Sequence, residues 1–218
     1  MKIRIAAAVM LVLGCPSLQA HRLDEYLQAT ILSIQKDELQ GQITLTPGVA
    51  VFSFVMAAMD TNADGTISDA EQRAYAARVL GDVSLSIDGR RLLPHLVAIR
   101  FPSQDDMKAG LGAIQIDFST PLPRGGGARK ISFENHHLTR ISAYQVNCLV
   151  PADPDLRILG QQRNYTQSSY RVDYSAPGFP VWFGAIPLLL LTRLAWLLLR
   201  RAPERAQPAI APSPMRIA

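Results

Sequence analysis

A twelve-residue stretch at 60–71, DTNADGTISDAE, carries oxygen donors at the spacing that a large, hard cation requires. In such a loop the first, third, fifth, seventh and twelfth positions supply the ligands. The seventh uses its backbone carbonyl and the twelfth uses both carboxylate oxygens. These positions are held by Asp60, Asn62, Asp64, Thr66 and Glu71. Magnesium prefers a smaller octahedral shell, so the pattern predicts a calcium site.

Three further residues fit the same loop. Gly65 stands where the chain must turn sharply, Ser68 stands where a water molecule often mediates, and Ile67 is expected to point inward as an anchor. A simpler interpretation is a polar turn followed by a helix that Ser68 and Glu71 cap. That interpretation explains the capping residues but not the acidic and amide spacing before them, so calcium binding is the favoured prediction.

The loop needs a helix on each side, and the flanking sequence predicts both. Thr46 and Pro47 are suited to cap and open a helix, and the apolar run at 48–59 follows them. After the loop, residues 68–80 are rich in helix formers. Gly81 comes next, and glycine favours the end of a helix. The predicted unit is therefore a helix, a loop and a second helix.

Short segments of alternating apolar and polar residues surround this unit. They are 26–34, 39–46, 83–87, 95–101, 112–119, 130–135, 141–150 and 169–175. In one of them Ile114, Ile116 and Phe118 alternate with polar residues, which places one face in a core and one in water. Seven or eight such strands predict a mainly β fold, an immunoglobulin-like β-sandwich with an inserted helix–loop–helix.

The first 20 residues are predicted to be a secretory signal peptide. Lys2 and Arg4 give a basic start, the apolar run that follows is too short to span a bilayer, and Ala20 is suited to cleavage. Lipoprotein cleavage before Cys15 is the variant with less support. Cys148 would then be alone, so no intrachain disulfide is expected, and we interpret it as a small buried residue on a strand.

A membrane anchor is predicted near the other end. Residues 179–199 are apolar with one charge, Arg193. A helix of this length reaches about 31 Å, enough for a hydrocarbon core. Two arginines follow at 200–201, and positive charge tends to stay inside, so the tail at 200–218 is predicted to be cytoplasmic and disordered. Residues 21–178 are then the extracytoplasmic β-domain.

The net charge of +4 belongs to these two ends. Between residues 21 and 178, lysine and arginine number 15 while aspartate and glutamate number 17, a balance of −2. The basic sequence pI therefore gives no support to nucleic-acid binding, and no nucleic-acid partner is expected.

Residues 48–80 resemble the EF-hand family. More widely, AHRLDEYLQATILSI, LTPGVAV, YQVNCLVP and QQRNYTQSSYRVDYS resemble a family of uncharacterised bacterial proteins. These have a signal peptide, an extracytoplasmic β-domain carrying an EF-hand and one terminal membrane helix. That resemblance implies a single-pass protein of the bacterial inner membrane with its main domain in the periplasm. The Ala-His start is similar to outside segments of HupE/UreJ-type proteins, associated with nickel handling, which have several spans where this chain has one candidate.

These features predict a non-enzymatic, membrane-anchored binding or scaffold protein with a structural calcium site. Three acidic ligands outside the cytoplasm suit a dissociation constant of about 10⁻⁴–10⁻³ M. EF-hands usually pair, and this chain has one such loop. Either the β-domain packs against the helices, or two chains form a homodimer through their loops.

The alternative is an accessory protein for nickel or copper. After cleavage at Ala20, the free amine and imidazole of His21 could chelate such an ion, and His136 or His137 could add ligands, although adjacent histidines on a strand point to opposite faces. An enzyme has less support, because no GxSxG, HExxH, Walker or CxxC motif is present and no catalytic residue is predicted.

Overall fold

The structure, a computed structural model, describes residues 24–178, 191–193 and 196. The chain divides into two compact units, 1–178 and 179–218, and the first holds all the strands described. The predicted signal peptide at 1–20 and most of the predicted membrane segment and tail lie outside the described residues. Within the described part of the chain, no helix is long and apolar enough to cross a membrane.

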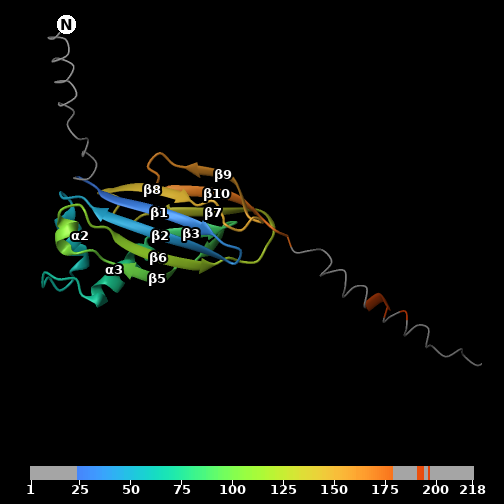
Figure 1. Cartoon of the computed structure of the whole chain (residues 1–218), viewed down its shortest axis with the longest axis horizontal. Helices are drawn as coiled ribbons and strands as arrows, with labels where there is room; N and C mark the ends of the chain where they lie inside the picture. Colours follow the sequence, from blue (N-terminus) through green and yellow to red (C-terminus); the bar gives the residue numbers. More distant parts are fainter. Residues whose placement is uncertain (1–23, 179–190, 194–195, 197–218) are drawn as a thin grey trace, which may run out of the picture. The chain divides into compact units, whose positions relative to one another are not determined.

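Two five-stranded sheets make up the described domain (Figure 1). The first sheet runs from edge to edge as β5 (His95–Arg100), β6 (Ile114–Pro121), β2 (Glu38–Pro47), β1 (Tyr26–Ile34) and β8 (Ser142–Cys148). The second runs as β4 (Arg90–Leu92), β3 (Val83–Ile87), β7 (Gly127–Asn135), β10 (Ser169–Ala176) and β9 (Arg157–Arg163). The strand pairs are antiparallel, except that β8 runs parallel to β1.

Alternation along the strands explains how the two sheets share one core. In the first sheet Ile43 of β2 lies opposite Ile116 of β6, and both are fully buried. In the second sheet Leu85 of β3 lies opposite Phe133 of β7, and both belong to the same hydrophobic cluster. Because strand side chains alternate between faces, each sheet contributes one apolar face to this core. The predicted mainly β fold is confirmed.

Two strands and a short helix were not predicted. β4 has only three residues, and β9, with the sequence RILGQQR, is exposed along most of its length. A polar edge strand shows no alternation for a periodicity argument to detect. The short helix α4 (Gln104–Lys108) is capped by the Ser103 hydroxyl, which accepts a hydrogen bond from the N–H of Asp106.

The first helix of the insert, α2 (Phe52–Met59), begins later than the sequence predicts. Thr46 and Pro47 belong to β2, where Pro47 lies opposite Tyr26 of β1. The residue at the N-cap is Val51, and no side chain caps the helix. The predicted cap was wrong because pairing with β1 determines the conformation of these residues and outweighs their local preference for a helix start.

The second helix, α3 (Asp69–Gly81), ends at the predicted glycine and leads directly into β3. Val55 and Met59 of α2 and Tyr75 and Val79 of α3 are buried in the core of the sandwich. Both helices lie at one end of the sheets (Figure 1). The opposite end of β7 pairs with Ala176, so the described domain ends at Gly178, far from the helices.

Replacing Gly41 is expected to destabilise the fold, because the ring of Phe118 fills the space where a Cβ at residue 41 would stand. We expect Gly41→Ala to lower the free energy of unfolding by about 1–3 kcal/mol in a denaturant titration. Gly81→Ala is the matched control, since a Cβ there meets open space. It should be neutral or stabilising by up to about 1 kcal/mol. Equal losses in both variants would contradict this packing argument.

Candidate functional site

The loop at 60–71 is shaped by hydrogen bonds between its own side chains and backbone. The Asp60 carboxylate accepts from the N–H groups of Asp64 and Gly65 at 3.2 and 2.9 Å. The Asn62 side-chain oxygen accepts from the N–H of Asp64 at 3.1 Å. Asp64 in turn accepts from the N–H and hydroxyl of Thr66, and these bonds lower the pKa of Asp64. Gly65 has φ +81°, a left-handed conformation that glycine adopts without strain.

Glu71 reaches back from the first turn of α3 and joins the two ends of the loop. One carboxylate oxygen accepts from the N–H and hydroxyl of Ser68 at 3.0 and 2.7 Å. The other accepts from the N–H and hydroxyl of Thr61 at 2.8 and 2.9 Å. The predicted capping box of Ser68 and Glu71 is therefore confirmed. These bonds, led by those from Ser68, lower the pKa of Glu71 to about 2, so its charge is present at neutral pH.

The five predicted ligands match calcium in type and order, but their carboxylates do not converge. Within the described residues, no three histidine, cysteine, aspartate or glutamate side chains form a group that could hold a metal ion. Each loop carboxylate faces N–H or O–H donors instead. The backbone turn at Gly65 already fits a calcium loop. Binding would require Glu71, which is 7% exposed, to exchange its bonds to Thr61 and Ser68 for the ion.

Apolar and polar contacts join the loop to the sandwich. Ile67, predicted to point inward, is partly buried and packs against the hydrophobic core. The Arg78 guanidinium of α3 donates to the carbonyl of Ala58 in α2 at 3.0 Å, which ties the two helices together. The loop is therefore anchored at its eighth residue and through both helices.

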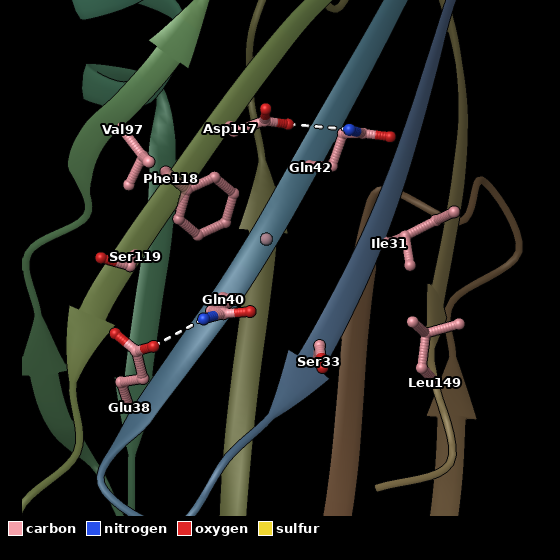
Figure 2. A pocket seen from close by; sticks show the side chains of 11 residues that line it. Ile31, Ser33, Glu38, Gln40, Gln42, Val97, Asp117, Phe118, Ser119 and Leu149 are labelled. Atoms are coloured by element: carbon pink, nitrogen blue, oxygen red, sulfur yellow. Dashed lines mark hydrogen bonds between the residues drawn. The ribbon is translucent and has the colours of Figure 1, made fainter. Parts of the chain in front are cut away.

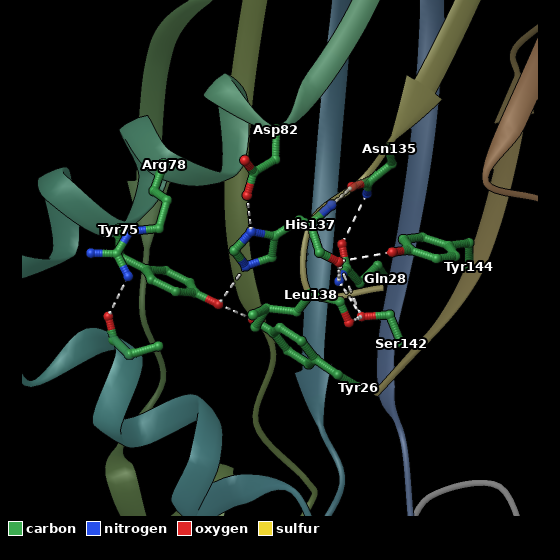
Figure 3. A network of polar contacts seen from close by, with 11 residues as sticks. Tyr26, Gln28, Tyr75, Arg78, Asp82, Asn135, His137, Leu138, Ser142 and Tyr144 are labelled. Atoms are coloured by element: carbon green, nitrogen blue, oxygen red, sulfur yellow. Dashed lines mark hydrogen bonds and ion pairs between the residues drawn. The ribbon is translucent and has the colours of Figure 1, made fainter. Parts of the chain in front are cut away.

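A chain of buried hydrogen bonds docks α3 on the sandwich (Figure 3). The Tyr75 hydroxyl of α3 lies 2.7 Å from the Tyr26 hydroxyl of β1 and 3.0 Å from Nε2 of His137. Nδ1 of His137 lies 2.7 Å from the carboxylate of Asp82, the C-cap of α3. Tyr26, Tyr75 and His137 are at most 1% exposed, whereas the Asp82 side chain is 42% exposed. The chain therefore runs from solvent into the core.

When the His137 imidazole is neutral, these hydrogen bonds have one direction. A carboxylate only accepts, so His137 donates from Nδ1 to Asp82 and accepts at Nε2 from Tyr75. The Tyr75 oxygen then accepts from Tyr26. This assignment holds for a neutral imidazole, because a protonated one would donate from both nitrogens. Burial, aided by Arg78, lowers the pKa of His137 in the same sense, although Asp82 opposes the shift.

The backbone of His137 is held from the opposite side. Gln28 of β1 and Tyr144 of β8 both donate to its carbonyl at 2.8 Å. The Asn135 side chain accepts from its N–H at 2.9 Å and donates to Gln28 at 2.9 Å. Among the described residues, no buried side-chain nitrogen or oxygen lacks a hydrogen-bond partner. The network thus joins α3 with β1, the end of β7 and β8.

The structure separates the two adjacent histidines that were candidate metal ligands. His136 is exposed and lies 3.2 Å from the Glu134 carboxylate. Both ring nitrogens of His137 already have hydrogen-bond partners, so in this arrangement it offers no lone pair to a metal. Both histidines follow the end of β7, in the turn that leads to β8, so strand alternation does not explain why they diverge. His21 lies outside the described residues.

Sequence reasoning missed the partners of His137. Tyr26 was assigned to a strand and Tyr75 to a helix, with no polar role for either. One signal was available, because Tyr75 and Asp82 are seven residues apart and two helical turns place such residues on one face. Nothing in the sequence indicated that His137, 62 residues after Tyr75, would meet that face.

Comparison with known proteins assigns the chain neither a family nor a function. No family model matches the chain, and no curated protein matches it. The residues and distances described above therefore carry the functional proposal.

Removing the Tyr75 hydroxyl is expected to cost more stability than removing that of Tyr26. Tyr75→Phe leaves the Tyr26 donor without an acceptor and His137 Nε2 without a donor, at about 1–3 kcal/mol for each unsatisfied group. Tyr26→Phe leaves Tyr75 still donating to His137, so no donor is orphaned. Denaturant titration of both variants measures the difference. A larger loss in Tyr26→Phe would reverse the direction assigned to the chain.

The fold is expected to lose stability as the pH falls through the range in which histidine titrates. The pKa of His137 is lower in the folded protein than the 6.5 of a free histidine, so the unfolded state binds more protons between the two values. Stability is thus retained above about pH 6.5 and declines below it. When the pH is lowered from about 7.5 to about 5, the melting temperature should fall less steeply in His137→Gln than in the wild type.

The exposed neighbour provides the matched control for this experiment. His136→Gln removes a histidine that is outside the buried chain and should keep the wild-type dependence on pH. If His137→Gln also kept that dependence, the protonation of another group would be responsible for it.

Proposed function

We propose that the chain is a binding or scaffold protein stabilised by calcium at a single EF-hand-type site. The observation that carries the proposal is the position of Glu71. Its carboxylate lies at the twelfth position of the loop, bonds to residues at both ends of it, and is ionised at neutral pH. In the bound state Asp60, Asn62 and Asp64 would supply side-chain oxygens, Thr66 its carbonyl, and Glu71 both carboxylate oxygens.

The packing of the helices supports a structural rather than a switching role. Switch-type EF-hands open their helix pair to expose a groove. Here α2 and α3 both bury side chains in the core of the sandwich, and Arg78 links them. The sandwich takes the place that a second hand usually fills, because Ile67 packs against its core. Bound calcium would therefore raise stability by an amount that grows with the logarithm of the calcium concentration above the dissociation constant.

The remaining assignments rest on the sequence. We propose that residues 1–20 direct export, that 179–199 anchor the chain in a bacterial inner membrane, and that residues 21–178 form a periplasmic immunoglobulin-like domain without enzymatic activity. A domain of this kind samples the higher calcium concentrations outside the cytoplasm, which suits a site with a dissociation constant of about 10⁻⁴–10⁻³ M.

Calorimetric titration of the full chain with calcium tests the site. We expect saturable binding with a dissociation constant of about 10⁻⁴–10⁻³ M, and a melting temperature that rises with calcium. Glu71→Gln should abolish both effects, because it removes a charged bidentate ligand while glutamine can still complete the capping box. Glu134→Gln, at an exposed carboxylate on β7, should bind like the wild type.

The absence of binding at millimolar calcium would refute the calcium proposal. A dimer that forms only with calcium would instead favour pairing of two loops across copies. The same protein would next be titrated with nickel and copper, and loss of that binding in a His21→Ala variant would support the accessory role.

A further inference from the structure

The outer face of the first sheet carries a groove with apolar walls (Figure 2). Ile31 of β1 and Leu149, just after β8, form one wall, and Val97 of β5 stands on the other side. These side chains belong to residues that are 42, 52 and 63% exposed. The groove has a volume of about 610 Å³, within the range of ligand-binding clefts. A sheet face that only met water would be expected to carry polar side chains at these positions.

The floor of the groove is rich in hydrogen-bond acceptors. Gln42 donates its amide to Asp117 at 2.8 Å, and Gln40 donates to Glu38 at 2.6 Å. Each glutamine thus uses its NH₂ group on a neighbouring carboxylate, and within the described residues its carbonyl oxygen has no protein donor. The groove therefore favours a ligand that brings N–H groups of its own.

The groove continues into a second hollow that is acidic. The two hollows share Glu38, Gln40 and Ser119, and the second has a volume of about 540 Å³ and extends to the β1–β2 turn. Asp37 and Asp153 line this end together with one cation, Lys36, so the carboxylates outnumber the cation. Asp117 pairs with Arg100 at 2.8 Å, and Lys36 lies 4.0 Å from Asp155. Across the described residues, no lysine or arginine pairs with Asp37, Glu38 or Asp153.

We propose that the groove and the acidic hollow together form a trough that binds an extended peptide segment of a partner protein. The segment is apolar in its first part and rich in lysine or arginine at the other end. The apolar side chains lie between Ile31, Leu149 and Val97, the peptide N–H groups donate to Gln40 and Gln42, and the cations meet Asp37, Glu38 and Asp153. From Gln42 to Glu38 the strand advances about 13 Å, which suits an extended segment of four residues before its basic end.

This inference names the partner chemistry of the binding role proposed above, and it does not depend on the calcium loop. The loop lies between α2 and α3, whereas the trough is lined by residues of β1, β2, β5, β6 and the segments beside them. Glu71→Gln should therefore leave peptide binding unchanged in protein that remains folded. Failure of calcium binding and failure of peptide binding are separate results.

Fluorescence anisotropy with the full chain and labelled hexapeptides tests the trough. The main probe is Val-Thr-Val-Thr-Lys-Lys. One matched probe ends in two glutamates, and a second replaces both valines with serine. We expect saturable binding of the main probe and at least about tenfold weaker binding of each matched probe. Equal binding of the acidic probe, or no saturable binding of the main probe, would overturn the proposal.

Substitutions locate the binding to the trough. Glu38→Gln and Leu149→Ser should each weaken the main probe by about fivefold or more, one at the acidic end and one at the apolar wall. Leu159→Ser, at an exposed leucine on β9 of the other sheet, is the matched control and should leave binding unchanged. Binding that responds to Glu38→Gln but not to Leu149→Ser, and that free spermidine displaces fully, would assign the site to small amines and overturn the peptide proposal.

Discussion

The position of the second helix depends on a hydrogen-bond chain that passes through a neutral histidine and ends at Asp82. Apolar contacts hold α3 against the core, but such contacts are non-directional and tolerate small rotations of a helix. The bonds from Tyr26 to Tyr75 and from Tyr75 to His137 tolerate much less, since a shift leaves a buried donor or acceptor unpaired. These hydrogen bonds also set the orientation of the loop, because α3 begins where the loop ends.

Loop and network act on the same helix one turn apart. Glu71 and Tyr75 are four residues apart in α3, so their side chains leave neighbouring parts of one helical face. Glu71 closes the loop, and Tyr75 and Asp82 fix the helix to β1 and to the connection after β7. Both sets of contacts therefore act on one helix of about 20 Å in length.

Much of the architecture follows from local pattern, and the exceptions have physical reasons. The strands at 26–34 and 83–87 were predicted with the observed bounds, since their alternation is regular and their turns are clear. β9 was missed because an exposed edge strand needs no apolar face. Thr46 and Pro47 were misassigned because pairing with a distant strand overrode a local helix signal. The calcium loop is a prediction from residue spacing alone, whereas His137 acquires its role from contacts between residues far apart in the chain.

The two ends of the sandwich differ in their connections, and this gives the domain a polarity. β7 has nine residues and spans about 30 Å, with the helices near one end and Gly178, the last residue of the first unit, near the other. The first unit therefore ends on the side of the sandwich opposite the loop. If the loop binds calcium as proposed, the ion would exchange with solvent at the end of the sandwich opposite Gly178.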